Sequence, residues 1–373
     1  MSSKTNTTRN DVLKHLEEIG KRILEDIGKE RPPKLKIRVR SLSNTVWCPE
    51  EKILKLGPRC AVREFFNLRE TRKFMQTVLM LSLIVRARRE GDYPTIRDLY
   101  YMGKHTIEYK DLHGKLRREN TWETQDESDY IIQDIEVLTN LLREDMGIMF
   151  DAKGRMVGKV IIRSKGNTID LSKMGVGAFA IPPNVGDIDI VDVDADYVLI
   201  VEKGAIFERL NNEEFWKKHN CVLMTGKGQP DRGTRRMAKR ISEEFDLPVY
   251  ILTDSDPFGF YIYSVYKYGS ISLSYESERL AVTRAKFLGV STSDIYRYKI
   301  PRKFIIKATD RDIRRARELL RYPWFQSKIW KEELSLFIKK REKVEIEAFS
   351  GFGFKYLSDK YIPEKIEREE FID

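Results

Sequence analysis

The sequence contains few cysteines, and none are paired at a diagnostic spacing. Three occur among 373 residues, Cys48, Cys60 and Cys221, and no two of them form a CxxC motif. This scatter argues against a disulfide framework, a zinc ribbon or a thiol redox centre. We therefore expect a protein suited to a reducing cytoplasm.

Long apolar segments are also lacking. The first residues, MSSKTNTTRN, include no apolar stretch of the kind found in a signal peptide. The longest apolar run, VLMLSLIV at 78–85, is far shorter than the ~20 residues that cross a bilayer. The sequence therefore predicts no membrane contact and a location inside the cell.

An excess of acidic charge is absent as well. The net charge is +10, and the 41% hydrophobic content is typical of a globular chain of two or three compact units. The basic charge is concentrated, since residues 59–118 and 297–321 each carry a net +7 while the remainder is slightly acidic. This pattern favours a polyanionic partner such as DNA, and the alternative is a pair of solvated helix faces.

The first 70 residues are predicted to form an arm that packs on a partner. Residues 10–30 place apolar side chains on one stripe of an otherwise charged segment, as in an amphipathic helix. The prolines of RPPK at 31–34 end this pattern, and the alternation that follows predicts a short hairpin.

Residues 71–165 show the order of a winged helix-turn-helix domain. Helical patterns at 71–90, 95–105 and 127–144 are followed by two strand-like runs in IMFDAKGRMVGKVIIR, with Gly154 in the turn between them. Such domains bind DNA with one helix in the major groove and the wing against the backbone. Three consecutive helices also occur by chance, so this order alone leaves the alternative open.

Residues 185–373 are predicted to form an α/β domain with a parallel sheet. The proline pair in AFAIPPNVGDIDIV marks a boundary, after which apolar runs alternate with helical patterns. Because buried runs joined by helices are typical of parallel strands, we expect three central strands. The runs are ADYVLIVEKG, CVLMTGKGQP and LPVYILTDSDPFG.

Three acidic residues follow these strands at the sheet edge where ligands bind in open parallel sheets. Glu202 ends the first run, and Asp254 and Asp256 follow the third. An all-oxygen site of this kind suits Mg²⁺, which needs only two or three protein ligands. The structural alternative is that Asp256, which precedes Pro257, caps a helix. Capping does not account for Asp254 and Glu202.

The segment TGKGQPDRGTRR at 225–236 lies between these acids. It lacks the spacing of a P-loop, so we expect no ATP site of that type. Gly226 and Gly228 alone would serve a tight turn, whereas exposed amides and basic side chains here would hold a phosphate backbone. The basic residues are Lys227, Arg232, Arg235 and Arg236.

Two adjacent tyrosines occur in YPTIRDLYYMGKH, on a helix predicted to begin at Ile96 after a Thr95–Asp98 capping box. The helical projection places Tyr100 on the apolar stripe, and Tyr101 on the neighbouring polar stripe. The polar stripe also includes Arg97, Lys104 and His105. Nearby cations favour a phenolate and hold phosphate, so Tyr101 is a candidate nucleophile. The alternative is that it only hydrogen-bonds or packs.

Taken together, five ordered motifs resemble the A subunit of DNA topoisomerase VI and the related eukaryotic meiotic transesterase. They are TIRDLYYM, VEKGAIFERL, GKGQPDRGTRRMAKRI, DSDPFGFYIYSVYKYGS and LAVTRAKFLGV, and the resemblance spans about residues 71–290. It implies a winged-helix (CAP-like) domain followed by a Toprim α/β domain. By position, the family's nucleophile is Tyr101, with Arg97 as its partner. The family's magnesium ligands are Glu202, Asp254 and Asp256.

The resemblance also implies a reaction and partners. The tyrosine attacks a DNA phosphodiester, leaving a 5′-phosphotyrosyl link and a 3′-hydroxyl that later reseals the break, and Glu202 is a further candidate proton donor or acceptor. One chain cuts one strand, so a double-strand break requires a homodimer in which each tyrosine meets the other subunit's metal site. The family obtains ATP hydrolysis from a separate B subunit, in a heterotetramer. We expect the complex at the nucleoid, and residues 10–30 are a candidate docking element.

Two other functions fit part of the sequence. The acids alone would suit a Toprim primase or nuclease, which leaves no protein on its product. A winged-helix protein with structural acids would bind DNA without magnesium and without cleavage.

Overall fold

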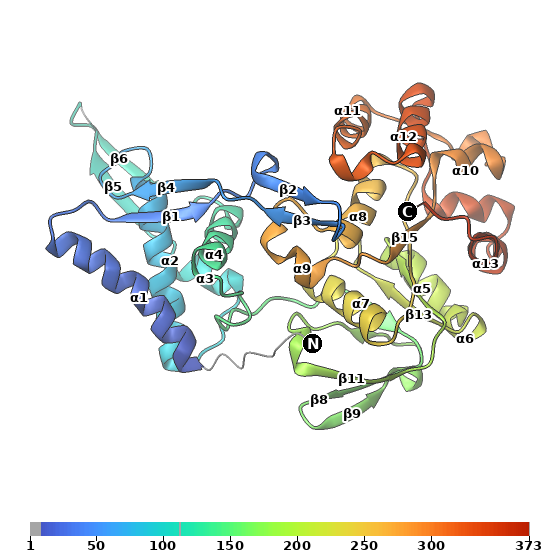
Figure 1. Cartoon of the computed structure of the whole chain (residues 1–373), viewed down its shortest axis with the longest axis horizontal. Coiled ribbons are helices and arrows are strands. Elements are labelled where there is room, and N and C mark those ends of the chain that lie inside the picture. The colour runs from blue at the N-terminus through green and yellow to red at the C-terminus, as the bar shows by residue number, and fades with distance from the viewer. Residues whose placement is uncertain (1–8, 112, 373) are drawn as a thin grey trace. The chain divides into compact units, whose positions relative to one another are not determined.

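The computed structural model describes residues 9–111 and 113–372, which form two compact units (Figure 1). Unit 1 contains the described residues up to Asn44 and the segment Leu56–Phe150. Unit 2 contains Thr45–Lys55 and the described residues from Asp151 onward. This division differs from the predicted boundaries at 70 and 165, because the first 70 residues contribute to both units.

Unit 1 is built mainly from helices. The predicted amphipathic helix, α1, packs its apolar residues Val12, Leu16 and Ile19 inside this unit, where they are buried. It therefore belongs to the folded unit, while Leu24 and Ile27 near its end remain exposed. The elements are α1 (Arg9–Gly28), β1 (Lys34–Arg38) paired antiparallel with β4 (Cys60–Glu64), α2 (Thr71–Glu90), α3 (Ile96–Met102), β5 (Thr106–Lys110), β6 (Leu116–Asn120) and α4 (Gln125–Thr139).

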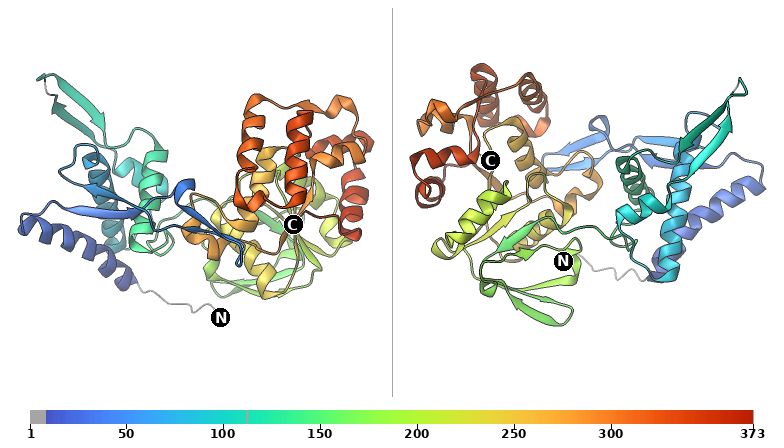
Figure 2. Two further views of the ribbon diagram at one scale, coloured as in Figure 1. Left: turned by 45° about the horizontal axis from the view of Figure 1, so that its top comes forward. Right: turned by 180° about the vertical axis from the view of Figure 1, so that it is seen from behind.

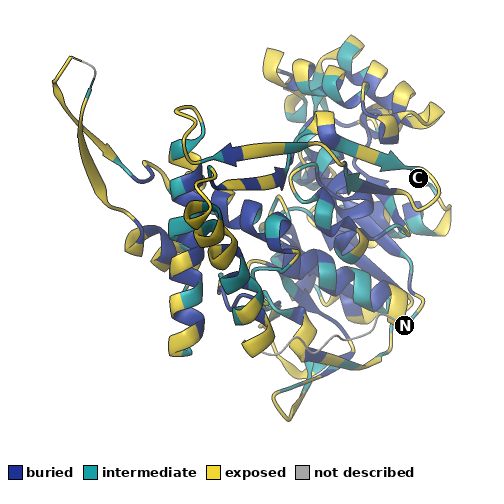
Figure 3. Cartoon of the chain, turned by 60° about the vertical axis from the view of Figure 1, so that its left-hand side comes forward, coloured by how far each residue is buried: buried dark blue, intermediate teal, exposed yellow. Residues whose placement is uncertain are grey.

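A hairpin that the sequence analysis missed lies between α3 and α4. Strands β5 and β6 pair antiparallel, and nearly all of their residues are exposed (Figure 3). Both views of Figure 2 show this hairpin extending beyond the helices of its own unit. The hairpin separates two helices that the sequence analysis placed in direct succession.

The wing predicted from IMFDAKGRMVGKVIIR is wrong. Its second run forms β7 (Arg155–Val157) and β8 (Val160–Ser164), both of which belong to unit 2 and pair with other strands. β7 pairs antiparallel with β13 (Cys221–Thr225), and Met156 and Val157 are buried there. The second run correctly marked strands, but β7 pairs with a distant strand and β8 pairs with strands that follow it, so neither pairs with the first run.

A buried ionic cluster joins the β1–β4 pair to α4. Asp134 of α4 accepts hydrogen bonds from Arg40 Nε and Nη2 at 3.0 and 2.8 Å, and it pairs with Arg63 of β4. All three side chains are buried. One carboxylate therefore balances two guanidinium groups away from water.

Changing Asp134 to Asn should destabilise unit 1 strongly. The change leaves Arg40 and Arg63 buried without their counter-charge, and breaking such a cluster costs about 3–5 kcal/mol. Chemical denaturation measures the loss, with the exposed Asp126→Asn on the same helix as the matched control. Equal unfolding free energies for the two variants would contradict the role of the cluster.

Unit 2 is organised around a six-stranded mixed sheet, so the α/β character predicted for this region is confirmed. The strand order is β10-β7-β13-β12-β14-β15, and the last four strands are parallel. The three predicted runs form β12 (Tyr197–Val201), β13 and β14 (Val249–Leu252), while β10 (Phe179–Ala180) and β15 (Ala285–Gly289) complete the sheet.

Side chains of the parallel strands alternate between two hydrophobic cores, one on each face of the sheet. Val198 and Ile200 of β12 pack with α7 and α8, whereas Leu199 and Val201 of the same strand pack with α5 and α6. This period of two follows from strand geometry, and it explains why the runs are apolar throughout. These helices are α5 (Gly204–Asn212), α6 (Phe215–Lys218), α7 (Arg232–Glu244) and α8 (Pro257–Tyr268).

The remaining elements of unit 2 surround this sheet. A second sheet of three antiparallel strands has the order β11-β8-β9. The hairpin of β2 and β3 also belongs to unit 2, where the ring centroids of Trp47 and Tyr268 lie 5.2 Å apart. The other elements are β2 (Thr45–Cys48), β3 (Ile53–Leu56), β9 (Asn167–Asp170), β11 (Ile188–Val193), α9 (Ser277–Leu280), α10 (Thr292–Arg297), β16 (Ile306–Lys307), α11 (Asp310–Leu319), α12 (Lys328–Lys340), β17 (Glu342–Lys343) and α13 (Ile362–Glu367). In the part of the chain that the structure describes, no helix has the length and apolarity needed to span a membrane.

Candidate active site

Helix α3 begins where the sequence predicted. Thr95 Oγ1 accepts a hydrogen bond from Asp98 N at 3.0 Å, and Asp98 Oδ2 accepts one from Thr95 N at 2.8 Å. This reciprocal capping box satisfies two backbone donors at the helix start. It fixes the rotational position of a helix that is only seven residues long.

The capped helix separates the two tyrosines. Tyr100 is 9% exposed, and Tyr101 is 61% exposed. Their rings pack edge to face with centroids 5.0 Å apart. The predicted projection is therefore confirmed for both side chains, and of the two it is Tyr101 that faces solvent.

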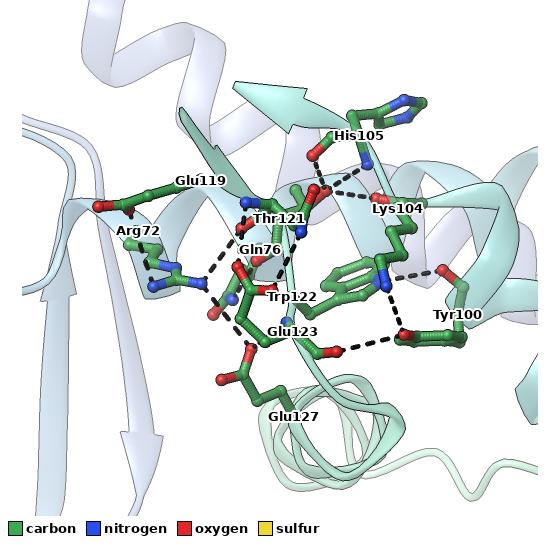
Figure 4. Close-up of polar contacts among 12 residues, drawn as sticks. Arg72, Gln76, Tyr100, Lys104, His105, Glu119, Thr121, Trp122, Glu123 and Glu127 are labelled. Carbon is green, nitrogen blue, oxygen red and sulfur yellow. Dashed lines mark hydrogen bonds and ion pairs between the residues drawn. The ribbon is translucent and has the colours of Figure 1, made fainter. Parts of the chain in front are cut away.

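A rigid frame holds the end of α3 (Figure 4). Trp122 is fully buried and donates from Nε1 to the Tyr100 carbonyl at 2.8 Å. Thr121 Oγ1 donates to the Gly103 carbonyl at 2.7 Å. Residue 103 must be glycine, because a Cβ there would lie 2.2 Å from a Trp122 ring carbon. The backbone of Tyr101 is thus held between two fixed neighbours.

The predicted cationic partners of Tyr101 lie on α3 or just after it, because the helix ends at Met102, before Lys104 and His105. Arg97, Lys104 and His105 are all exposed. Lys104 Nζ donates to the Tyr100 hydroxyl at 2.9 Å, and the Tyr100 oxygen is the main cause that raises the pKa of Lys104. The backbone N–H of His105 donates to Thr121 Oγ1 at 2.7 Å, which leaves the His105 ring directed away from the frame (Figure 4).

The strand order brings Glu202 and Asp254 together. β12 and β14 are adjacent, so the residues that follow them lie side by side. Glu202 Oε2 accepts a hydrogen bond from Asp254 N at 3.0 Å, and Glu202 N donates to the Leu252 carbonyl at 2.9 Å. The two predicted acids therefore meet at the carboxyl ends of neighbouring strands.

Each aspartate has a structural contact as well. Asp256 Oδ1 accepts from the N–H groups of Phe258 and Gly259 at 2.9 and 2.8 Å, so it caps α8 as the capping alternative predicted. Asp254 Oδ1 accepts from Ile346 N at 2.8 Å. Its other oxygen, Oδ2, pairs with Lys203 Nζ at 3.0 Å.

Burial is the main influence on the pKa of these acids, and it outweighs the lowering effect of Lys203 on Glu202 and Asp254. Burial, followed by repulsion from Asp254, raises the pKa of Glu202 to about 7. Burial raises the pKa of Asp254 to about 6, and it also raises that of Asp256. A divalent cation would relieve both effects, and an all-carboxylate donor set suits a hard ion such as Mg²⁺.

The carboxylates are not arranged as a complete ligand set. Across residues 9–111 and 113–372, no three carboxylate, imidazole or thiolate groups converge as metal ligands do. Lys203 is the nearby cation instead, and it also pairs with Glu345 and Glu347 at 3.2 and 2.7 Å. The residues fit a divalent ion in their chemistry, provided that Lys203 releases Asp254.

The basic loop at 225–236 divides into an exposed part and a buried part. Lys227 is exposed, while the N–H of Gly228 donates to the Glu202 carbonyl at 2.8 Å, so the loop passes beside the acids. Arg232 and Arg235 are 4% and 1% exposed, and Arg232 pairs with the buried Glu276 at 2.5 Å. Burial lowers the pKa of Arg235 to about 10.

The prediction that Arg232 and Arg235 contact DNA is therefore corrected. Their guanidinium groups lie inside unit 2, where a phosphate backbone has no access in this conformation. The ion pair of Arg232 with Glu276 joins α7 to the segment around Glu276. Lys227 is the residue of this loop that retains an exposed charge.

Sequence reasoning missed three residues that shape the site. Lys203, Glu345 and Glu347 form the ionic cluster beside Asp254. The position of Lys203 directly after Glu202 was a usable signal. The two glutamates lie more than 140 residues further along the chain, and no local pattern connects them with the acids.

Comparison with known proteins matches three family descriptions. Residues 72–148 match the family described as "Type IIB DNA topoisomerase". Residues 197–366 match the Toprim domain of the family that comprises the A subunit of topoisomerase 6 and Spo11. Between them, "All-beta domain in DNA topoisomerase VI alpha subunit" covers 153–194, which contains the sheet of β8, β9 and β11.

Curated relatives are similar over nearly the whole chain. The A subunit of type 2 DNA topoisomerase 6 from Aeropyrum pernix is 56% identical over 362 residues, which cover 94% of this chain and 93% of the relative. The protein of the same name from Hyperthermus butylicus is 53% identical, covering 95% and 94%. The A subunit of DNA topoisomerase 6 from Arabidopsis thaliana is 34% identical, covering 89% and 75%.

Proposed function

This chain belongs to the family of DNA topoisomerase VI A subunits and is the catalytic, DNA-cleaving subunit of a type IIB topoisomerase; from this premise we propose that Tyr101 is its nucleophile. The observation that supports Tyr101 is its exposure on a capped helix whose other tyrosine is buried. Arg97, one turn earlier on the exposed side of α3, is proposed as its partner for the phosphate.

The proposed reaction conserves the number of phosphoester bonds. Tyr101 Oη attacks a DNA phosphorus and loses its proton, while the bond from phosphorus to the 3′-oxygen breaks and that oxygen takes up a proton. The 5′ end is then linked to the enzyme through a phosphotyrosine. Attack by the 3′-hydroxyl reverses the step and reseals the strand without any other energy source.

Glu202, Asp254 and Asp256 are proposed to hold Mg²⁺ for this reaction. Glu202 lies half-buried beside Asp254 just after β12, and its raised pKa makes it a candidate to hold or release a proton near the 3′-oxygen. When bound, the ion supplies positive charge to the phosphate and to the leaving oxygen.

Unit 1 is proposed to be a winged-helix (CAP-like) domain in which the β5–β6 hairpin interrupts the helix-turn-helix. Helix α2 precedes α3, the hairpin follows, and α4 completes the helical set. The exposed Lys104 and His105 stand at the base of the hairpin and, with Lys227 of unit 2, are proposed to contact the DNA backbone.

The complete enzyme is proposed to be a heterotetramer that acts on double-stranded DNA and contains two copies of this chain with two ATPase B subunits. Each copy has one proposed nucleophile and can cut one strand, so a double-strand break requires two copies. We propose, as in the family it resembles, that Tyr101 of one copy works with the acids of its partner. The exposed Leu24 and Ile27 of α1 are candidates for docking the B subunit.

A covalent-transfer assay tests this function. The chain is mixed with the partner ATPase subunit, Mg²⁺, ATP and internally labelled plasmid, and the reaction is quenched with detergent. Label should migrate with the polypeptide, and chelation of Mg²⁺ before the quench should reverse most of the attachment. Cleaved DNA without attached protein would favour a Toprim nuclease, and binding without cleavage would favour a non-enzymatic protein.

A further inference from the structure

We infer that Tyr100 is a positioning residue, whose hydroxyl holds the Lys104 ammonium group beside Tyr101 to receive the DNA phosphate. This inference rests on the proposed role of Tyr101. It explains why a buried core position has a tyrosine, since phenylalanine would fill the same volume.

The Tyr100 hydroxyl has two defined partners. Its oxygen accepts a hydrogen bond from Lys104 Nζ at 2.9 Å, and its O–H donates to the Glu123 carbonyl at 3.3 Å (Figure 4). The ring itself is buried, and its backbone carbonyl is bonded to Trp122. The hydroxyl is thus a fixed anchor at the edge of the core, oriented from both sides.

This anchor restricts a side chain that is otherwise mobile. A lysine side chain has four rotatable bonds, and fixing it costs up to about 2 kcal/mol of conformational entropy. Lys104 lies four residues after Tyr100, and its Nζ is 5.2 Å from the centre of the Tyr100 ring. Part of the ordering that phosphate binding requires is therefore already present before DNA arrives.

The ammonium group keeps donors for a ligand. Lysine has three N–H donors, of which Tyr100 accepts one. Among the described residues, Lys104 forms no ion pair within 4.0 Å, unlike Arg117 and Arg118 of the adjacent hairpin, which pair with Asp111 and Glu108. Lys104 is thus a positive charge near Tyr101 that no carboxylate of the described residues neutralises by contact.

The carboxylate of Glu123, just before α4, is bonded to Asn120 and not to Lys104. Both oxygens of Glu123 accept hydrogen bonds from Asn120, from its N–H at 3.2 Å and its side-chain amide at 3.0 Å. Only the backbone carbonyl of Glu123 takes part in the Tyr100 contact. The Tyr101 and Glu123 side chains add to the electrostatic environment that keeps Lys104 charged, with its pKa raised. A DNA phosphate would complete the set of partners around Lys104.

A double-mutant cycle tests the pair. The rate of covalent attachment is measured in single turnovers at fixed salt, with Mg²⁺ and the partner ATPase subunit, for the parent, Tyr100→Phe, Lys104→Met and the double variant. Loss of the lysine should slow attachment about 10–100-fold, and loss of the hydroxyl should slow it several-fold, in the range expected for charged hydrogen bonds. The double variant should be no slower than Lys104→Met alone.

The outcomes separate this inference from the proposed function. Additive effects of the two changes, or a parental rate for Tyr100→Phe, would overturn the positioning role. Lys104→Arg should restore part of the rate, and thermal unfolding should be similar for all variants, since a purely structural role would shift unfolding instead. The exposed Lys173→Met is the matched control and should show no coupling to Tyr100→Phe. Attachment that survives Tyr101→Phe would contradict the proposed nucleophile, whatever the result of the cycle.

Discussion

Tyr101→Phe should abolish covalent attachment of DNA, with a loss of more than about 10⁴-fold in the rate of attachment. The change removes only the attacking oxygen, and the exposed ring can keep its edge-to-face contact with Tyr100. The fold and the affinity for DNA should therefore remain close to those of the parent. Transfer of labelled DNA to the polypeptide measures the first effect, and a gel-shift titration measures the second.

The chain offers a matched control for this change. Tyr93 is 64% exposed in the same unit, close to the 61% of Tyr101, but lies outside α3. Tyr93→Phe should attach DNA at the parental rate. If Tyr101→Phe still attaches DNA and Tyr100→Phe does not, the nucleophile is Tyr100, and the assignment of Tyr101 is wrong.

Glu202→Gln should reduce Mg²⁺-dependent cleavage by about 10²–10⁴-fold. The amide keeps the size of the side chain and can still accept the hydrogen bond from Asp254 N, but it removes the negative charge that a divalent ion requires. Unfolding stability should stay the same or rise, because the buried charge and its repulsion of Asp254 are both removed.

The comparison variant is Glu243→Gln, on the exposed side of α7. Glu243 pairs with Lys239 at 3.2 Å at the surface, and such pairs contribute little. The Glu243→Gln variant should cleave DNA at the parental rate at every Mg²⁺ concentration of a titration. If Glu202→Gln cleaves DNA at the parental rate, with the same Mg²⁺ concentration at half-maximal cleavage, Glu202 is not a ligand of the metal.

The features that local sequence determines were predicted well. The start of α3 depends on Thr95 and Asp98, which are three residues apart, and the exposure of Tyr101 depends on helical periodicity within one short segment. The positions of Glu202 and Asp254 follow from two apolar strands and the general rule for parallel sheets. Each of these inferences needs no knowledge of distant residues.

Strand pairing was predicted poorly because alternation shows which side chains are buried and not which strands are neighbours. The runs at 148–150 and 155–163 suggested a hairpin, yet β7, which begins the second run, pairs with β13 almost 70 residues away. The β5–β6 hairpin was missed for the opposite reason. Its residues are almost all exposed, and although Ile107 and Tyr109 alternate with polar residues in β5, β6 contains a single apolar residue, Leu116.

The side-chain environment of charged residues was also out of reach. Arg232 and Arg235 lie in a basic run that suggested a phosphate contact, but both are buried, and Arg232 pairs with Glu276, about 40 residues later. Likewise, the sequence placed Tyr100 correctly in the core without indicating that its hydroxyl would bind Lys104. Tertiary contacts decide these roles.

The central claim is that Tyr101 of one chain reacts at the acids of its partner. A mixture of Tyr101→Phe chains and Glu202→Gln chains, assembled with the ATPase subunit, contains dimers in which one intact tyrosine and one intact glutamate lie on different chains. The account predicts that this mixture nicks one strand of a plasmid and that the DNA is attached only to the Glu202→Gln chain. Tyr101→Phe alone should be inactive, and Glu202→Gln alone should show only its strongly reduced cleavage. A mixture that forms these dimers and yields no nicks, or DNA attached to the Tyr101→Phe chain, would contradict the account.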